Sequence, residues 1–189
     1  MRERRETAEK LYQTALTQAR QPFFYKDHGV ADSVDGRFEL TVLHAFLVWN
    51  RIRGEGRDGA KLAQALFDVM FTDMERALRL MGVGDLGVPH HMRRMMRGFK
   101  GRALAYRNGL DNPDDPEVLL EALSRNLFGT VEEIKDDAPL RWFADYMKAQ
   151  AGFLARQPWN DISKGTISFQ GNANDQQNTK EPPDSRVAA

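Results

Sequence analysis

Residues 60–81 read AKLAQALFDVMFTDMERALRLM, and this stretch decides the fold. Its apolar side chains recur every three or four positions, the repeat of an α-helix, and Gly82 then ends the pattern. At about 100° per residue, the polar side chains gather on one side and the apolar ones cover a much wider arc. Such a helix must bury itself against several neighbours, so the stretch predicts a helical bundle.

The rest of the chain carries the same kind of signal, and alternation of the β type is nearly absent. Pro22 closes a first helix, Asp32 or Ser33 caps a second, and prolines open the last three. The six predicted helices cover about 8–19, 34–53, 60–81, 89–108, 116–129 and 139–156. We therefore expect an all-α protein that forms a single helical bundle of about six helices.

The chain divides into three segments of different character. Residues 1–21 form an N-terminal helix, 22–158 a helical domain, and 159–189 a polar tail. From Ser163 onward the chain reads SKGTISFQGNANDQQNTKEPPDSRVAA, with only scattered apolar residues. Such a sequence cannot bury enough apolar surface to offset its ordering entropy, so we expect a disordered C-terminal tail.

Composition excludes several classes of protein. The 189 residues include 27 Lys+Arg, 27 Asp+Glu and no cysteine, which excludes a disulfide scaffold, a thiol nucleophile and Cys-ligated zinc. The longest apolar run, Val42 to Trp49, is far shorter than the ~20 residues of a membrane span. The charged N-terminus has no apolar segment behind it and is not a secretory signal. We expect a cytoplasmic protein with no specific DNA partner.

The neutral total hides a polarised distribution of charge. Residues 90–110 carry six cations and no acid, whereas residues 111–145 carry ten acids and three cations. The two segments either neutralise each other in the fold or leave the basic one facing an outside partner. Both readings stay open at the level of sequence.

The helix over 89–108 is a basic amphipath with opposed faces. One face is apolar, and the other carries Arg93, Arg94, Arg97 and Lys100. Such a helix suits an anionic membrane surface, RNA or an acidic partner, or it is an ordinary bundle helix with a solvated side. Gly98, Gly101 and Ala105 form a strip of small residues, which predicts close approach of a neighbouring helix of this protein or, alternatively, of a client helix.

Methionine is concentrated in and before this helix. Flexible thioether side chains suit a surface that adapts to apolar partners, although they also fill cores. We expect a surface for a client protein that is bordered by Met70, Met74, Met81, Met92, Met95, Met96 and Phe99.

One carboxylate projects from the apolar arc of the 60–81 helix. Asp73 needs a cation or several donors there. The preceding helix offers a narrow polar stripe with Arg37 and His44, so we predict that Asp73 pairs with one of them. The pair could act in acid–base chemistry, but no nucleophile or phosphate loop accompanies it, and we favour a structural pair that fixes helix register.

The remaining polar residues lack the spacing of a metal or cofactor site. Asp68 and Asp73 are five residues apart and diverge on a helix, while His90 and His91 point about 100° apart. We expect no metal, no cofactor and no small-molecule substrate.

Three stretches resemble one known family over about residues 22–155. They are GRFELTVLHAFLVWNRI (36–52), LAQALFDVMFTDMERALRLMGVGDLGV (62–88) and MRRMMRGFKGRALAY (92–106). Together they resemble the ubiquinol-cytochrome c chaperone family, assembly factors of the cytochrome bc1 complex, in its alphaproteobacterial form. The chain departs from that family at Trp49-Asn50 and at His90-His91.

The resemblance implies a non-enzymatic, all-α chaperone. Such a chaperone holds newly made cytochrome b, or another bc1 subunit, while the complex is assembled. It also implies the ribosome or the inner-membrane surface as further partners, with the protein cytoplasmic or peripheral at that membrane. The alternative function is a basic-helix module that binds the ribosome, RNA or an anionic membrane.

Overall fold

The computed structural model describes residues 2–129 and 137–171, and it confirms an all-α protein. Within them lie six helices of 11 to 25 residues and two of four residues. The helices are α1 (Arg2–Ala19), α2 (Phe23–Lys26), α3 (Val34–Ile52), α4 (Gly56–Leu80), α5 (Val88–Asp111), α6 (Pro116–Asn126), α7 (Ala138–Ala155) and α8 (Trp159–Ile162). No strand occurs in these ranges.

The helix ends follow local chemistry. The Ser33 side chain accepts a hydrogen bond from the Gly36 amide and so caps α3. A proline lies in the first turn of α5, α6 and α7, where its missing N–H costs nothing. These signals explain why the six long helices lie close to the predicted positions.

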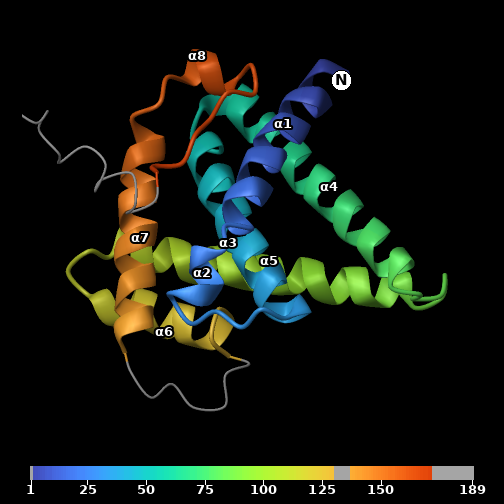
Figure 1. The fold of residues 1–189 in the computed structure, drawn as a ribbon. Coiled ribbons are helices and arrows are strands. Elements are labelled where there is room, and N and C mark those ends of the chain that lie inside the picture. The colour runs from blue at the N-terminus through green and yellow to red at the C-terminus, as the bar shows by residue number, and fades with distance from the viewer. Residues whose placement is uncertain (1, 130–136, 172–189) are drawn as a thin grey trace, which may run out of the picture.

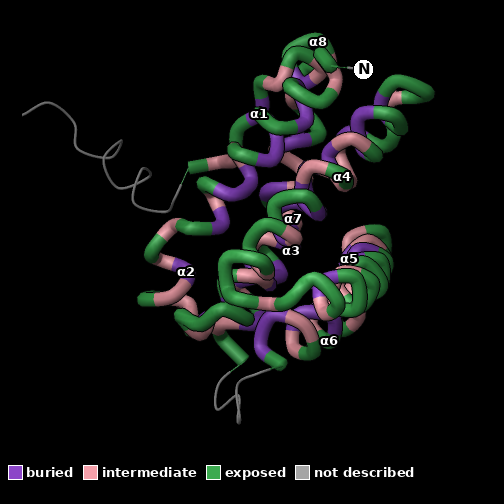
Figure 2. Tube along the Cα trace, turned by 90° about the vertical axis from the view of Figure 1, so that its right-hand side faces the viewer, coloured by how far each residue is buried: buried purple, intermediate pink, exposed green. Residues whose placement is uncertain are grey.

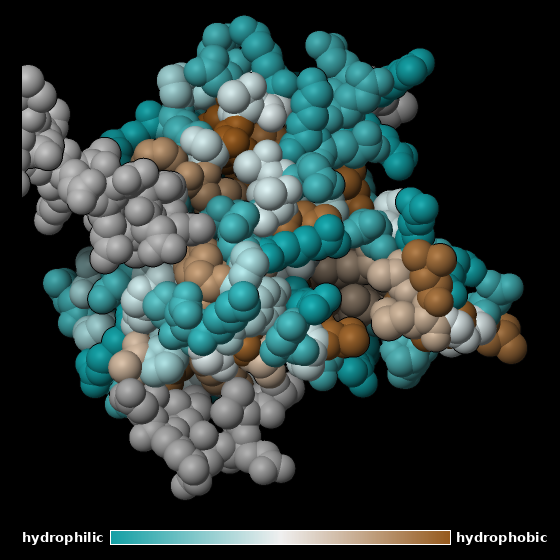
Figure 3. Space-filling view, viewed as in Figure 1, coloured by the Kyte–Doolittle hydropathy of each residue, from teal (hydrophilic) through white to brown (hydrophobic). Residues whose placement is uncertain are grey.

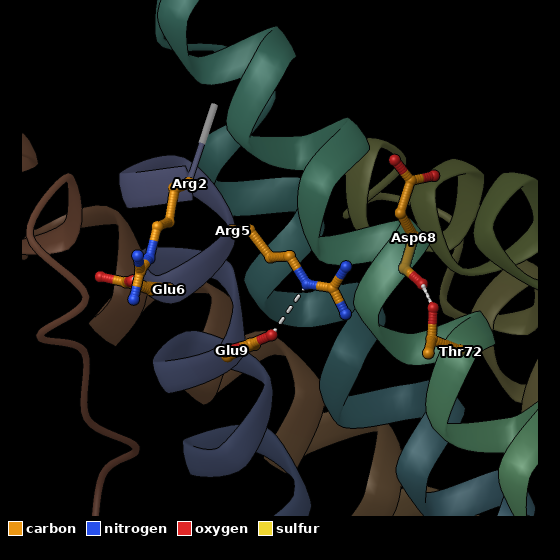
Figure 4. Close-up of polar contacts among 6 residues, drawn as sticks. All are labelled: Arg2, Arg5, Glu6, Glu9, Asp68 and Thr72. Atoms are coloured by element: carbon orange, nitrogen blue, oxygen red, sulfur yellow. Dashed lines mark hydrogen bonds and ion pairs between the residues drawn. The ribbon is translucent and has the colours of Figure 1, made fainter.

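Helix α1 begins earlier than its apolar pattern predicts. Arg5 pairs with Glu9 one turn further on, and Arg2 pairs with Glu6 in the same way. Figure 4 shows Arg5 reaching from α1 toward α4, where the Thr72 hydroxyl donates to the backbone carbonyl of Asp68. The Arg2–Glu6 and Arg5–Glu9 ion pairs are exposed, so each stabilises the helix by only about 0.3–0.5 kcal/mol.

Helix α3 is the centre of the bundle. Helices α1, α4, α5 and α7 all pack on it, and Figure 1 shows them arranged around it. Eleven of its 19 residues are buried. Figure 2 shows buried residues turned inward on α1 and α3 and exposed residues along the outer side of α5.

An ion pair between buried Glu39 and half-buried Arg102 joins α3 to α5. The Arg102 guanidinium donates two hydrogen bonds to the Glu39 carboxylate, one of them from Nε to Oε2 at 2.7 Å. Burial raises the pKa of Glu39, and the facing guanidinium offsets this only in part. Removing Arg102 would leave the buried Glu39 carboxylate unpaired, so the pair favours this arrangement of α5 against α3.

The prediction of a disordered tail over 159–189 is wrong for residues 159–171, which are ordered. Residues 159–162 form α8, and the segment 163–171 runs back along α7, with Ile162 and Ile167 buried. Amide side chains hold it: Gln150 exchanges two hydrogen bonds with the backbone of Gln170, and Gln157 does the same with Ser168. Residues 172–189 lie outside the described residues.

The close approach between α5 and α6 lies further along α5 than the predicted small-residue strip. A Cβ atom added at Gly109 would lie 2.7 Å from both the Cα and the Cβ of Leu119 on α6. The equivalent atom at Gly101 would meet nothing within 4 Å. Gly109, and not Gly101, is therefore the position where a missing side chain lets the two helices pack.

Gly109→Ala should lower the free energy of unfolding by about 1–3 kcal/mol, because the added methyl collides with backbone that cannot move aside. The matched variant Gly101→Ala should raise it by up to about 1 kcal/mol through helix propensity alone. Urea unfolding followed by circular dichroism measures both. Equal effects at the two positions would contradict this account of α5–α6 packing.

Candidate functional site

An open groove of about 660 Å³ lies where α4 and α5 leave the bundle. Helix α1, the start of α3, the end of α4 and the start of α5 supply its walls. The groove exists because the buried face of α4 stops at Met74. The apolar residues Ala77, Leu78 and Met81 continue past the bundle and line the groove instead.

The groove combines an apolar lining with charges of both signs. Its apolar side chains are Leu16, Val34, Phe38, Met74, Ala77, Leu78, Met81 and Met95. Its charged side chains are Arg20, Arg37, Arg94, Asp32, Asp35 and Asp73. A surface of this kind fits the apolar face of an amphipathic helix with polar groups along its edges.

The structure divides the predicted methionine surface. Met70, Met74 and Phe99 are buried, whereas Met81 and Met96 are exposed and Met92 and Met95 are half-buried. Met74, Met81 and Met95 line the groove. Met96 and Phe99 line a second hollow of about 440 Å³, formed with Trp49, Phe67 and Leu104 among others. The predicted single surface is thus split, part of it in the core and the rest in two hollows.

The four basic residues predicted on α5 are all exposed. Among the described residues, none of Arg93, Arg94, Arg97 and Lys100 lies in an ion pair. Arg94 faces the groove, and Lys100 borders the second hollow. Part of the acidic segment, residues 130–136, lies outside the described residues, and the part that is described does not pair with these cations.

The predicted pairing of Asp73 with His44 or Arg37 is wrong. Asp73 is exposed at the edge of α4, where its Oδ2 accepts a hydrogen bond from the Tyr12 hydroxyl of α1 at 2.9 Å. Burial, together with this carboxylate, raises the pKa of Tyr12. Arg37 instead pairs with Asp32 at 2.7 Å. The rotation of α4 turns Asp73 toward α1, and His44 faces α7.

His44 is sealed inside the bundle as a neutral side chain. Its Nδ1 lies 2.8 Å from the carbonyl of Leu40, which can only accept, so Nδ1 carries the proton. Its Nε2 therefore accepts from the Tyr146 hydroxyl at 2.8 Å, and that hydroxyl accepts from Gln18 at 3.1 Å. Burial lowers the pKa of His44 to about 4. Its ring atoms are fully engaged in holding α3 against α7.

Residues 2–129 and 137–171 contain no group of three or more His, Asp or Glu side chains placed to hold a metal ion. They also contain no helix with the length and hydropathy needed to cross a bilayer.

Sequence reasoning missed the half of the groove that comes from outside α4 and α5. Tyr12 and Leu16 reach it from α1, Arg20 from just after α1, Tyr25 from α2 and Phe38 from α3. A tyrosine on an otherwise apolar helix face was the available signal, because a buried hydroxyl needs a polar neighbour. Here that neighbour is Asp73.

The fold and the groove define an all-α protein with an open, mixed-polarity binding surface. The model of the family described as ubiquinol-cytochrome C chaperone matches residues 26–169. The chain therefore belongs to this family. The matched region includes most of the segment 163–171 that packs back along α7.

Relatives of known name agree with the family. The chain is similar to ubiquinol-cytochrome-c reductase complex assembly factor 1 of Xenopus laevis, 26% identical over 139 residues, which are 74% of this chain and 68% of that protein. It is also similar to Protein CBP3, mitochondrial, of Saccharomyces cerevisiae, 27% identical over 150 residues, which are 78% of this chain but only 44% of the yeast protein.

A solved structure supports the fold. The crystal structure of the Cbp3 homolog from Brucella abortus matches with a TM-score of 0.77 and 32% sequence identity. The match covers 88% of this chain and 90% of the Brucella chain. The helical arrangement is therefore shared along nearly the whole length of both.

Protonation of His44 should make the protein less stable in mild acid. Its folded pKa of about 4 lies below its ordinary value of 6.5, so the unfolded chain binds more protons between these two pH values. The contribution is fully present above pH 6.5 and should fall by about 2 kcal/mol at pH 5. Urea unfolding at pH 7 and pH 5 measures this loss.

His44→Gln should remove that part of the pH dependence, whatever its effect at pH 7. His28, whose pKa is also lowered by burial, is present in both proteins, so its contribution cancels. An unchanged difference between pH 7 and pH 5 in the variant would contradict the buried neutral assignment.

Proposed function

We propose that this protein is an assembly chaperone for the ubiquinol-cytochrome c reductase (bc1) complex. Its client is newly made cytochrome b, and the groove binds an apolar helix of that client. The observation that supports this most is the open groove lined by Met74, Met81 and Met95 in a chain of this family. Named relatives are described as assembly factors of the same complex.

The groove suits a membrane-protein client in physical terms. A transmembrane helix that has not yet met its partners exposes apolar side chains that water disfavours. Leu78, Met81 and Met95 offer an apolar surface, and thioether side chains adapt to different shapes. Arg20, Arg37 and Arg94 stand beside it and can meet polar groups at the helix end.

The proposed activity involves no chemical step. His44 is buried and has both ring nitrogens in hydrogen bonds, so it cannot reach a substrate. Asp73 faces the groove but is held by the Tyr12 hydroxyl, whose raised pKa keeps it protonated. Neither residue has the partner that a general base needs.

The protein works on the cytoplasmic side, at the surface of the inner membrane.

A second candidate is a module that binds the ribosome or RNA. The observation that favours it is the set of exposed cations on α5, of which Arg93, Arg97 and Lys100 lie outside the groove. A chaperone that receives a new chain could use these residues at the ribosome while the groove holds the client.

Ala77→Glu/Met81→Glu should reduce the level of assembled bc1 complex in a deletion strain and leave the cytochrome b transcript intact. Two charges in the groove disfavour an apolar helix, and the positions are exposed, so folding should survive. Leu104→Glu, an exposed position at the second hollow, is the matched control and should restore the complex. Normal complex levels with the groove variant would end the proposal.

If the ribosome or RNA candidate holds, binding to purified ribosomes should weaken steeply with salt and be lost in Arg93→Glu/Arg97→Glu. Sedimentation at rising salt measures this binding. Indifference to salt, or full binding by the variant, would exclude α5 as the contact.

A further inference from the structure

The turn between α4 and α5, with the last residue of α4, carries the two most exposed large apolar side chains in the described residues. Leu86 is 98% exposed and Leu80 79%, and Met81 beside them is 57% exposed. Figure 1 shows the turn at the far right, where α4 and α5 converge, and Figure 3 shows hydrophobic side chains gathered at that end. We name residues 80–87 the apolar tip.

The apolar tip has a defined backbone. Gly82 has a φ of +85°, the left-handed conformation that ends α4, and the amides of Gly82 and Val83 bond back to carbonyls of its last turn. The Gly87 amide donates to the Gly84 carbonyl at 2.8 Å, and the next residue, Val88, is buried. Leu80 and Leu86 therefore flank or lie in a turn whose backbone is fixed by hydrogen bonds.

Leu80 and Leu86 serve neither the core nor the groove. In the described part of the chain, neither leucine lines the groove, the second hollow or three smaller hollows elsewhere on the surface. The turn that carries them lies at a corner of the molecule (Figure 1), and both side chains are mostly exposed, so an occupant has to surround them. A fluid bilayer surface does this without supplying a matching pocket.

The charges near the apolar tip are mostly positive. From 76 to 100 the chain holds six cations and one acid, Asp85. Arg79 pairs with Asp85, whereas Arg93, Arg94 and Arg97 on the first turns of α5 are exposed and lie in no ion pair among the described residues. An anionic membrane surface has acyl chains beneath a layer of phosphates. The apolar side chains of the tip suit the acyl chains, and the neighbouring cations suit the phosphates.

We infer that the apolar tip inserts into an anionic lipid bilayer, with Arg93, Arg94 and Arg97 at the lipid phosphates. The insertion goes beyond the proposed chaperone function and needs no client. It would hold the groove beside the membrane, since Met81 belongs to both the tip and the groove lining.

A single fluorescent label tests this insertion. Because the chain has no cysteine, Leu86→Cys takes one environment-sensitive NBD group, and Leu104→Cys is the matched control. Residue 104 lies about 24 Å along α5 from its start, at 1.5 Å per residue. With phosphatidylglycerol vesicles the label at 86 should brighten several-fold and shift to the blue, and the label at 104 should change little. Phosphatidylcholine vesicles should give no response at either position.

Two variants separate insertion from simple adsorption. Leu80→Ser/Leu86→Ser should reduce co-sedimentation with phosphatidylglycerol vesicles at least tenfold, and Arg93→Glu/Arg97→Glu should do the same. Unchanged NBD fluorescence at residue 86, or undiminished vesicle binding by Leu80→Ser/Leu86→Ser, would overturn the inference. The apolar tip would then be better explained as a contact for another protein. The proposed client groove stands or falls separately, because these measurements contain only protein and lipid.

Discussion

Burial of α3 on nearly every side is the constraint on which the rest of the structure depends. Where α3 packs against α1, α4, α5 and α7, its buried polar side chains have no water, so they need partners within the protein. His44 finds Tyr146 on α7, and Glu39 finds Arg102 on α5. Arg51 donates to the carbonyl of Leu154 at the end of α7. These bonds join α3 to α5 and α7 within the apolar packing.

The groove and the apolar tip follow from where that packing stops. Helix α4 has 25 residues, but its buried face ends at Met74, so its last turns extend beyond the bundle. Helix α5 returns from the same corner toward α3. The side chains between the two form an open surface on a rigid support, and the apolar pattern of α4 continues there without a partner inside the chain. A binding surface held on packed helices needs little rearrangement when a client arrives.

Sequence reasoning could predict the helices, because their ends depend on neighbours in the chain such as Ser33 and the prolines. It could not predict contacts that depend on how helices rotate against one another. Asp73 meets Tyr12, 61 residues away, because α4 turns that edge toward α1. The segment after Ser163 reads as disordered by composition, yet Gln150 and Gln157 bind its backbone. The apolar arc of α4 was recognised, although only the structure shows that its last turns are exposed.

The central claim is that the groove holds newly made cytochrome b, and site-specific photo-crosslinking tests it most directly. A photoreactive amino acid is placed at Leu78, inside the groove, and in a second strain at Leu104, outside it. After brief illumination of growing cells, the account predicts a crosslink from position 78 to cytochrome b and none from position 104. Crosslinks from position 78 to other proteins only, or equal yields at the two positions, would contradict it.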